Sequence, residues 1–309
     1  MIITITLNPA IDKTIEVDDL QMGMLNKVEN VILDPGGKGI NVSKVVESLG
    51  GRSIATGFLG GNSGHYIEKT LNALEIENTF IHIKEETRTN LKLFNRLTRE
   101  TTEINEPGPH VSEADVNALI ERVVSLIKLP CIVVLSGSAP HGIGAGIYEV
   151  LVDICKEKGA TVFLDAYGEG LMEGIKAHPD FIKPNRKEAE HFCGFKIETD
   201  LDLVNAGKQF LEAGVKNVFI TLGDEGALFY NHEKALRLHP LRVNAHSRVG
   251  AGDAFVGGFL YAVEQGYDVE ESLRLAVATS AGAVMTIGTK PMNMEWIMGQ
   301  IDRVVLELI

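Results

Sequence analysis

The sequence has few cysteines, and none are paired at the spacing of a metal or redox motif. Its three cysteines, Cys131, Cys155 and Cys193, lie apart in a chain of 309 residues, and their number is odd. Disulfide-stabilised secreted domains and zinc-binding modules use closely spaced sets of cysteines, and disulfide frameworks use even numbers. We therefore expect reduced thiols and a cytoplasmic protein.

Long apolar runs and clusters of basic residues are also missing. No stretch is long and apolar enough to span a bilayer. Residues 2–7 are apolar but few, with no basic residues before them, which favours a first β-strand over a signal peptide. The formal net charge is -13, whereas nucleic-acid binding requires clusters of Lys and Arg. We expect no nucleic-acid or membrane partner, while small phosphorylated ligands, which need only a few local cations, stay possible.

Strand-like and helix-like segments alternate along the chain. A chain of this length can bury a large core, as one α/β domain or as a domain with an accessory piece. The alternation predicts a three-layer α/β/α fold with a mostly parallel central sheet, in which ligands gather at the carboxyl ends of the strands. No linker or repeat divides residues 1–309. The predicted strands are 2–7, 54–59, 131–135, 161–165, 181–183 and 218–222, and the predicted helices are 40–49, 112–127, 147–158 and 203–213.

Two segments, 11–33 and 88–104, interrupt this alternation with β-like patterns and no helix of their own. We predict that they pair into a small sheet that stands off the main domain as a β-lid over the site. The alternative is two hairpins that face solvent.

The segment from Val249 to Phe259 combines two glycines, an aspartate and an apolar run with helical spacing. Glycine leaves backbone N–H groups accessible, and the N-terminus of a helix attracts anions, so Gly250, Ala251 and Gly252 predict a phosphate site. Asp253 would repel that phosphate unless it takes the proton of an attacking hydroxyl. The pattern therefore indicates a kinase centre. Taken alone, it is more typical of an ordinary helix start capped by Asp253.

A second glycine-rich segment, Gly36-Gly37-Lys38-Gly39-Ile40-Asn41, precedes the first predicted helix. Its glycines allow close approach of a ligand, Lys38 adds a positive charge, and Asn41 lies one helical turn further on. No Walker A pattern is present, so the phosphates would be held by the backbone around Gly250 instead.

These two segments, together with Lys183-Pro184-Asn185-Arg186-Lys187-Glu188, resemble the ribokinase/PfkB carbohydrate kinase family. The opening Thr6-Leu7-Asn8-Pro9-Ala10-Ile11-Asp12 is similar to the branch of 1-phosphofructokinase and tagatose-6-phosphate kinase, whose substrates already carry a phosphate. The resemblance covers nearly the whole chain. It implies a ribokinase-like fold, ATP with Mg²⁺, and a sugar phosphate as acceptor.

The resemblance also implies roles for individual residues on the sugar side. Asp12 would accept hydrogen bonds from sugar hydroxyls, and Arg88 and Lys38 would hold the phosphate already on the sugar, the arginine as a bidentate fork. The alternative for Arg88 is a solvated surface position. The remaining substrate contacts implied are Gly36, Gly37, Asn41 and, less strongly, Ser138.

On the nucleotide side, the resemblance implies a site that follows two predicted strands. Asn185 and Glu188 match the family's Asn-x-x-Glu region, where the carboxylate would organise water around Mg²⁺. Asp253 would be the catalytic base, with the N–H groups of Gly250, Ala251 and Gly252 around the transferred group. The other residues implied for ATP are Lys183, Thr221, Gly223, Gly226 and Gly252.

Three positions depart from the family pattern. Arg248 stands before the second glycine segment, where threonine is frequent, and His141 follows Pro140, where small or polar residues are common. Residues 286–293 only loosely resemble the family's monovalent-cation loop, so K⁺ is no more than an optional cofactor.

The sequence predicts an ATP-dependent ketohexose-phosphate kinase, with 1-phosphofructokinase activity first. Tagatose-6-phosphate kinase and 6-phosphofructokinase are the alternatives within the family, and a non-catalytic sugar-phosphate sensor is the alternative outside it. Apolar residues on both faces of the lid segments, Ile15, Val17, Leu91 and Leu93, further predict a homodimer joined through the β-lid, since an isolated small sheet is marginal in water.

Overall fold

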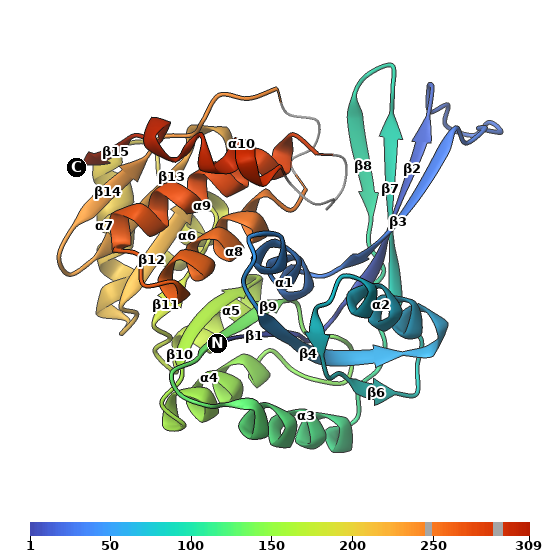
Figure 1. Ribbon diagram of the computed structural model, residues 1–309, viewed down its shortest axis with the longest axis horizontal. Helices are drawn as coiled ribbons and strands as arrows, with labels where there is room; N and C mark the ends of the chain where they lie inside the picture. Colours follow the sequence, from blue (N-terminus) through green and yellow to red (C-terminus); the bar gives the residue numbers. More distant parts are fainter. Residues whose placement is uncertain (245–248, 287–292) are drawn as a thin grey trace.

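The computed structural model describes residues 1–244, 249–286 and 293–309, and it has three layers with a smaller sheet to one side (Figure 1). The middle layer is an 11-stranded sheet of the described residues. In spatial order its strands are β15 (Leu306–Leu308), β14 (Ala235–Leu238), β13 (Ala227–Asn231), β12 (Asn217–Thr221), β11 (Phe181–Ile182), β10 (Thr161–Ala166), β9 (Ile132–Gly137), β1 (Ile2–Thr6), β4 (Ser53–Gly60) and β5 (Glu77–Asn78), with β6 (Ile81–Ile83) also paired to β4.

In spatial order, the strands from β4 to β12 run parallel. The strands β13, β14 and β15 then extend the sheet in antiparallel pairs, of which β14 and β15 are separated in the chain by α8, α9 and α10. Every residue of β1 is buried, because a parallel strand with helices over both faces meets apolar neighbours on each side. The fold class expected from the alternation is confirmed. The antiparallel edge formed by β13, β14 and β15 was not predicted.

Helices cover both faces of the sheet. Ile3 and Ile5 of β1 point into the layer with one group of helices, whereas Ile2 packs on the opposite side. Thr4 also faces that opposite side, where its hydroxyl bonds Ser43 at 2.7 Å. On the Ile3 side lie α3 (Glu113–Leu126), α4 (Ile147–Glu157), α5 (Gly168–Ile175), α6 (Arg186–Cys193) and α7 (Asp200–Glu212); on the other lie α1 (Lys38–Ser48), α2 (Gly61–Ala73), α8 (Ala251–Glu264), α9 (Val269–Val284) and α10 (Met294–Met298).

The helix starts differ in a way that bears on function. The helices α3, α6, α7 and α9 each begin with a side-chain capping box that satisfies backbone N–H groups. In contrast, α1 and α8 begin after Gly37 and Gly250 and have no side-chain cap. The Ile40 N–H in the first turn of α1 bonds the Thr6 hydroxyl. No side chain of the described residues caps the N–H groups that precede it or those at the start of α8, so these groups can bind a ligand.

The two segments that interrupt the alternation lie side by side in a four-stranded sheet, which we call the small sheet (Figure 1). Its strands are β3 (Asn30–Gly36), β2 (Ala10–Val17), β7 (Arg88–Asn95) and β8 (Glu100–Ile104), and its two inner strands, β2 and β7, run parallel. Both β2 and β3 are continuous with the central domain, since β2 follows β1 and β3 leads into α1. The small sheet is thereby attached next to the N-terminus of α1.

Candidate active site

A row of polar side chains ends the central strands. Thr6 of β1, Ser136 of β9 and Asp165 of β10 are neighbours in register, and Lys183 directly follows β11. All four residues are buried. This row lies at the carboxyl ends of parallel strands, where ligands of such sheets collect.

The N-terminus of α1 sits directly on this row. Gly37 has φ 117°, and a Cβ at that position would lie 2.7 Å from the Thr6 side chain, so only glycine fits. The Thr6 hydroxyl accepts a hydrogen bond from the Ile40 N–H at 3.1 Å. The predicted glycine segment therefore holds α1 against the end of β1, with Lys38 as the first helical residue.

The N-terminus of α8 carries Asp253, the predicted base. Gly250 precedes the helix with φ 78°, the left-handed conformation that glycine adopts most readily. Asp253 is 8% exposed, and its Oδ2 accepts a hydrogen bond from Asn41 Nδ2 at 2.7 Å. Asn41 thus lies beside the predicted base from α1, and no hydrogen bond to Oδ1 of Asp253 comes from the residues that the structure describes.

The electrostatic surroundings of Asp253 suit proton transfer. Burial raises the pKa of its carboxyl to about 6, while Lys38, the Asn41 hydrogen bond and Lys183 oppose the shift and Asp165 adds to it. A base is most effective when its pKa lies near the working pH. At neutral pH Asp253 is mostly ionised and can still accept a proton.

Lys38 and Lys183 meet on one carboxylate. Lys38 Nζ lies 2.8 Å from Asp165 Oδ1 and Lys183 Nζ lies 3.2 Å from the same oxygen. Lys38 also stands 3.8 Å from the centre of the Tyr167 ring. Burial alone lowers the pKa of Lys38, but the charges of Asp165, Tyr167 and Asp253 outweigh it and the net shift is upward. Lys38 therefore carries its charge at any working pH.

The small sheet contributes Asp12, predicted to bind sugar hydroxyls. Lys92 Nζ contacts its Oδ2 at 2.8 Å, and Asn90 Nδ2 donates to its Oδ1 at 3.1 Å. Gly36 passes close by, since a Cβ there would lie 2.6 Å from the Asp12 carboxylate. Asp12 is thus oriented by two neighbours on β7 that sequence reasoning missed.

Arg88, at the start of β7, is held by backbone carbonyls. Its two terminal nitrogens donate to the carbonyls of Glu106 and Asn8, each at 2.9 Å. Burial lowers the pKa of its guanidinium. Asn8 in turn donates to the Ser138 hydroxyl at 3.3 Å. Arg88 and Ser138 therefore lie around one residue, Asn8, and Arg88 is not the solvated surface residue of the alternative interpretation.

Several buried polar atoms of this region have no hydrogen-bond partner within residues 1–244, 249–286 and 293–309. An unsatisfied buried group costs about 1–3 kcal/mol, so such groups are rare unless a ligand completes them. In the described residues around the strand ends, α1 and the small sheet, these atoms are Asn8 Oδ1, Asn41 Oδ1, Arg88 Nε, Asn90 Oδ1, Ser136 Oγ and Asp165 Oδ2.

The residues expected to bind nucleotide continue the row beyond Lys183. Asn185 and Glu188 form the capping box of α6, with the Glu188 carboxylate 2.8 Å from the Asn185 N–H. Asn185 forms a backbone bridge with Thr221 at the end of β12. The turn after β12 contains the last two residues expected there, Gly223 and Gly226.

Of the three positions that depart from the family pattern, the structure fully describes only His141. The side chain of His141 is exposed, and its carbonyl accepts a hydrogen bond from the Val111 N–H at 2.8 Å. Arg248 lies outside the described residues, as do residues 287–292 of the segment considered for K⁺. The structure adds Asp165 and Lys92 to the site; Asp165 ends a predicted strand, and that position could have identified it.

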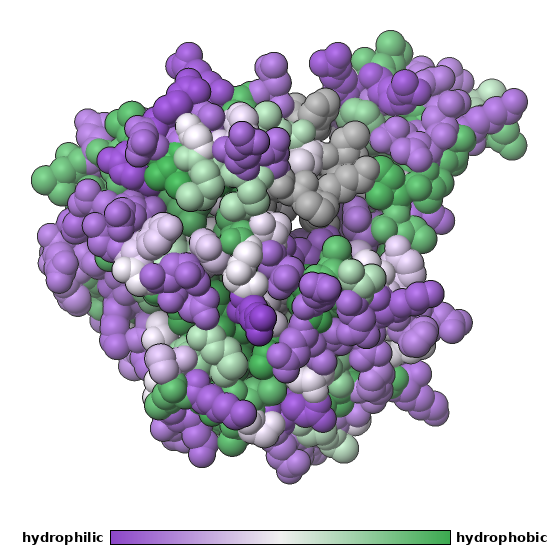
Figure 2. Space-filling model, viewed as in Figure 1, coloured by the Kyte–Doolittle hydropathy of each residue, from purple (hydrophilic) through white to green (hydrophobic). Residues whose placement is uncertain are grey.

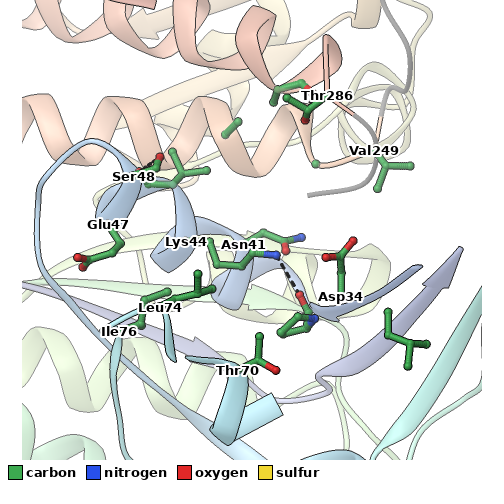
Figure 3. Close-up of a pocket in the computed structure, with 16 residues that line it drawn as sticks. Asp34, Asn41, Lys44, Glu47, Ser48, Thr70, Leu74, Ile76, Val249 and Thr286 are labelled. Atoms are coloured by element: carbon green, nitrogen blue, oxygen red, sulfur yellow. Dashed lines mark hydrogen bonds between the residues drawn. The ribbon is translucent and has the colours of Figure 1, made fainter. Parts of the chain in front are cut away.

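A cavity of about 280 Å³ borders the site from the side of α2 (Figure 3). Asn41 and Gly250 line it, but Asp253, Lys38 and Asp165 do not. Lys44 and Asp34 lie near one another at its edge, where Lys44 Nζ donates to the Pro35 carbonyl at 3.3 Å. The predicted base, Asp253, therefore lies outside this cavity.

A model of the pfkB family of carbohydrate kinases matches residues 5–296. The chain belongs to this family. It is therefore an ATP-dependent sugar kinase, and the resemblance stated from the motifs is confirmed.

Relatives of this kinase share names with the predicted branch. It is 36% identical to a 1-phosphofructokinase of Bacillus subtilis, over 94% of this chain and 95% of the relative. It is 35% identical to a 1-phosphofructokinase of Escherichia coli, over 91% of this chain and 90% of that relative. A crystal structure of phosphofructokinase-2 from Escherichia coli with substrates and products is similar at a TM-score of 0.93 and 27% identity, covering 98% of each chain.

Two absences among the described residues bear on possible membrane contact and metal binding. No helix among them is long and apolar enough to cross a membrane. Within the same ranges, no group of three or more His, Cys, Asp or Glu side chains is arranged to hold a metal ion. A Mg²⁺ held mainly by ATP phosphates and water needs only one or two protein carboxylates, so this absence does not test the predicted role of Glu188.

The hydrogen bond from Asn41 stabilises ionised Asp253, so replacing Asn41 with alanine is expected to raise the pKa of Asp253 further. The acidic limb of the kcat/KM profile then moves to higher pH, because the base must be ionised to act. Ser43→Ala, a change on the same helix whose hydroxyl bonds Thr4 instead, is the control and should leave the limb in place. A limb at the wild-type pH in Asn41→Ala would contradict the assigned hydrogen bond.

Proposed function

We propose that this kinase transfers the terminal phosphoryl group of ATP to fructose 1-phosphate and forms fructose 1,6-bisphosphate. The observation that carries the proposal is the buried Asp253, with its pKa near 6, at the uncapped N-terminus of α8. The names of the curated relatives favour fructose 1-phosphate over other sugar phosphates.

In this mechanism Asp253 Oδ1 accepts the proton of the attacking sugar hydroxyl. The hydroxyl oxygen forms a bond to the terminal phosphorus of ATP as the bond from that phosphorus to the bridging oxygen breaks, and ADP leaves. The N–H groups of Gly250, Ala251 and Gly252 face the transferred group at the positive end of α8 and stabilise its charge. The uncapped start of α8 supports this assignment.

Asp12 anchors the sugar hydroxyls, because Lys92 and Asn90 hold its carboxylate in one orientation. Gly36, Gly37 and Asn41 border the sugar from the start of α1, and Ser138 approaches from the end of β9. Arg88 is assigned to the phosphate already present. Its terminal nitrogens bond backbone carbonyls, so the donor is its buried Nε, which has no partner among the described residues, and not the bidentate fork expected from the resemblance. One domain with the small sheet as a β-lid would close around this substrate.

ATP would lie along the row from Lys183 through Asn185 and Thr221 to the Gly223–Gly226 turn. Mg²⁺, if carried by ATP here, would be held by water on Glu188 and would neutralise phosphate charge. One solved structure of Escherichia coli phosphofructokinase-2 is a complex with potassium. In this kinase most of the segment considered for K⁺, residues 286–293, lies outside the described ranges. A cytoplasmic location is part of the same proposal.

Coupled turnover with ATP distinguishes the candidate substrates. We expect fructose 1-phosphate to give the highest kcat/KM, ahead of fructose 6-phosphate and tagatose 6-phosphate. Solved structures of phosphofructokinase-2 include a complex with fructose 6-phosphate, so that sugar is the principal competitor. A higher kcat/KM for either 6-phosphate would overturn the substrate assignment while leaving the kinase assignment in place.

Asp253→Asn is expected to lower turnover by a factor of ~10²–10⁴, the usual worth of a general base. Binding of fructose 1-phosphate, measured by calorimetry, should change little, because the amide keeps the size of the carboxyl. A sensor would show no turnover before the substitution and none after it. More than about a tenth of wild-type turnover in the variant would remove Asp253 as the base.

Arg88→Ala should raise the KM for the sugar phosphate by about ten- to a hundredfold, since a charge-assisted bond to phosphate contributes about 1.5–3 kcal/mol. The KM for ATP should remain near the wild-type value. The control is Arg96→Ala, which removes an exposed arginine of the small sheet paired with Asp18. Equal increases in both KM values would indicate a general defect of the small sheet instead.

The small sheet also supports a homodimer. Of the residues named for its apolar faces, Ile15, Leu91 and Leu93 are half-buried, but Val17 is buried within the chain, contrary to expectation. Other apolar side chains are exposed on or beside this sheet, as the green surface at the upper right of Figure 2 illustrates. They are Met22, Met24, Leu25, Val28, Val31, Leu33, Leu97 and Ile104.

A second copy that offers the same surface would cover these residues. We expect sedimentation equilibrium at micromolar concentration to give twice the chain mass of 33.6 kDa. Leu33→Lys should shift the protein toward monomer, whereas Val150→Lys, at an exposed position of α4, should not. A monomer in the wild type would remove the dimer and leave the catalytic assignment standing.

A further inference from the structure

Lys38, Asp165 and Lys183 form a buried cluster, here called the lysine pair with its aspartate. The proposed mechanism gives these three residues no joint role. Two ammonium groups bond the same oxygen, and the side chains are 15%, 1% and 7% exposed for Lys38, Asp165 and Lys183. Buried charges need close compensation because water is excluded. Asp165 and the nearby Asp253 together match the two ammonium charges, and the N-termini of α1 and α8 add positive potential at the same place, which favours an anion there.

The starts of α1 and α8 increase the positive potential around the two lysines. Lys38 is the first residue of α1, and no acidic residue occupies the first turn of that helix. The Lys183 ammonium lies 3.3 Å from the point that a Cβ on Gly252 would occupy, in the first turn of α8. A cation is unfavourable at a helix N-terminus, whereas an anion is favourable. Each ammonium group is therefore repelled by the positive end of a nearby helix. An anion bound between the ammonium groups and the backbone N–H groups would remove this repulsion.

The same cluster is electrostatically coupled to the base. Lys38 and Lys183 both lower the pKa of Asp253, and Asp165 raises it. An anion bound by the lysine pair would therefore lie close to the base, where phosphoryl transfer takes place. The phosphate already on the sugar lies at the other end of a ketohexose from the attacked hydroxyl, and so away from this cluster.

We propose that Asp165 is a positioning residue that gathers Lys38 and Lys183 into one cationic pair, and that this pair holds the phosphoryl group being transferred from ATP. The proposal rests on the proposed function. It gives Lys38 a different task from the one the resemblance implied, and leaves Arg88 as the cation for the existing phosphate. Asp165 itself keeps the two ammonium groups adjacent before ATP arrives.

Calorimetry on Lys38→Met separates the two tasks of that lysine without relying on turnover. ATP should bind about tenfold or more weakly, the range for a lost charge-assisted bond to phosphate, while the affinity for fructose 1-phosphate stays within about twofold. Lys183→Met should show the same pattern. Weakened fructose 1-phosphate binding with unchanged ATP binding would overturn the proposal and return Lys38 to the existing phosphate.

Asp165→Asn tests the positioning role. We expect kcat to fall by about ten- to a hundredfold, because small displacements of groups around a reacting centre have effects of this size. The acidic limb of the kcat/KM profile should move to lower pH, since a negative charge that raises the pKa of Asp253 is gone. Wild-type kcat and an unmoved limb would overturn the role of Asp165.

Asp180→Asn is the matched control. Asp180 is also buried and pairs with Lys216 at 2.7 Å, but it precedes β11 and lies at the opposite edge of the same strands. This change should lower the denaturation midpoint without moving the acidic limb. If the limb moves equally in both variants, the effect is a general loss of packing and the proposal fails.

The cationic pair can still be tested if one variant does not fold or if the preferred sugar phosphate is a different one. If Asp165→Asn does not fold, the ATP affinities of Lys38→Met and Lys183→Met still support or overturn the cationic pair. If the wild type prefers another sugar phosphate, the same profiles are measured with that sugar. Failure of the proposed function would appear in the substrate assays of the wild type. Failure of the cationic pair would appear only when the variants are compared with the wild type.

Discussion

Burial of charge where two helix N-termini meet the ends of parallel strands is the constraint on which this kinase depends. The starts of α1 and α8 have no side-chain caps and converge on Asp165 and Lys183. Burial keeps the pKa of Asp253 high enough for proton transfer, while Lys38 and Lys183 keep it low enough for ionisation near neutral pH. The glycines at 37 and 250 make this approach possible, because larger residues would separate α1 from β1 or strain the start of α8.

Much of the fold was predictable from the sequence for a physical reason. Strands buried on both faces are short apolar runs that end in polar residues, as residues 2–7 and 161–165 illustrate, and the amphipathic helices between them fix a parallel order. The antiparallel strands β13, β14 and β15 were missed because antiparallel strands at a sheet edge interrupt that alternation without a distinctive pattern. The pairing of β2 with β7 joins residues far apart in the chain, and the β-like patterns alone pointed to it.

The site residues were predictable where a local sequence motif fixes the backbone. They were less predictable where side chains far apart in the sequence contact each other in the fold. Asp253 and the glycines around it follow from local sequence. The contact of Asn41 with Asp253 spans the chain, and the sharing of Asp165 by Lys38 and Lys183 depends on the register of β10 and β11. Lys92 was missed for the same reason, since its partner Asp12 lies on a different strand. Val17 was expected at an exposed face and is buried, because strand patterns do not reveal which face another element covers.

The central claim is that Asp253 is a buried carboxyl whose pKa is raised to about 6 from an ordinary value of 3.8. Its side-chain carbon can be followed by NMR in the free enzyme as pH is lowered, with Asp253→Asn used to assign the signal. The account predicts a titration midpoint about two pH units above that of an exposed aspartate. A midpoint near 4, as for an aspartate in water, would contradict it.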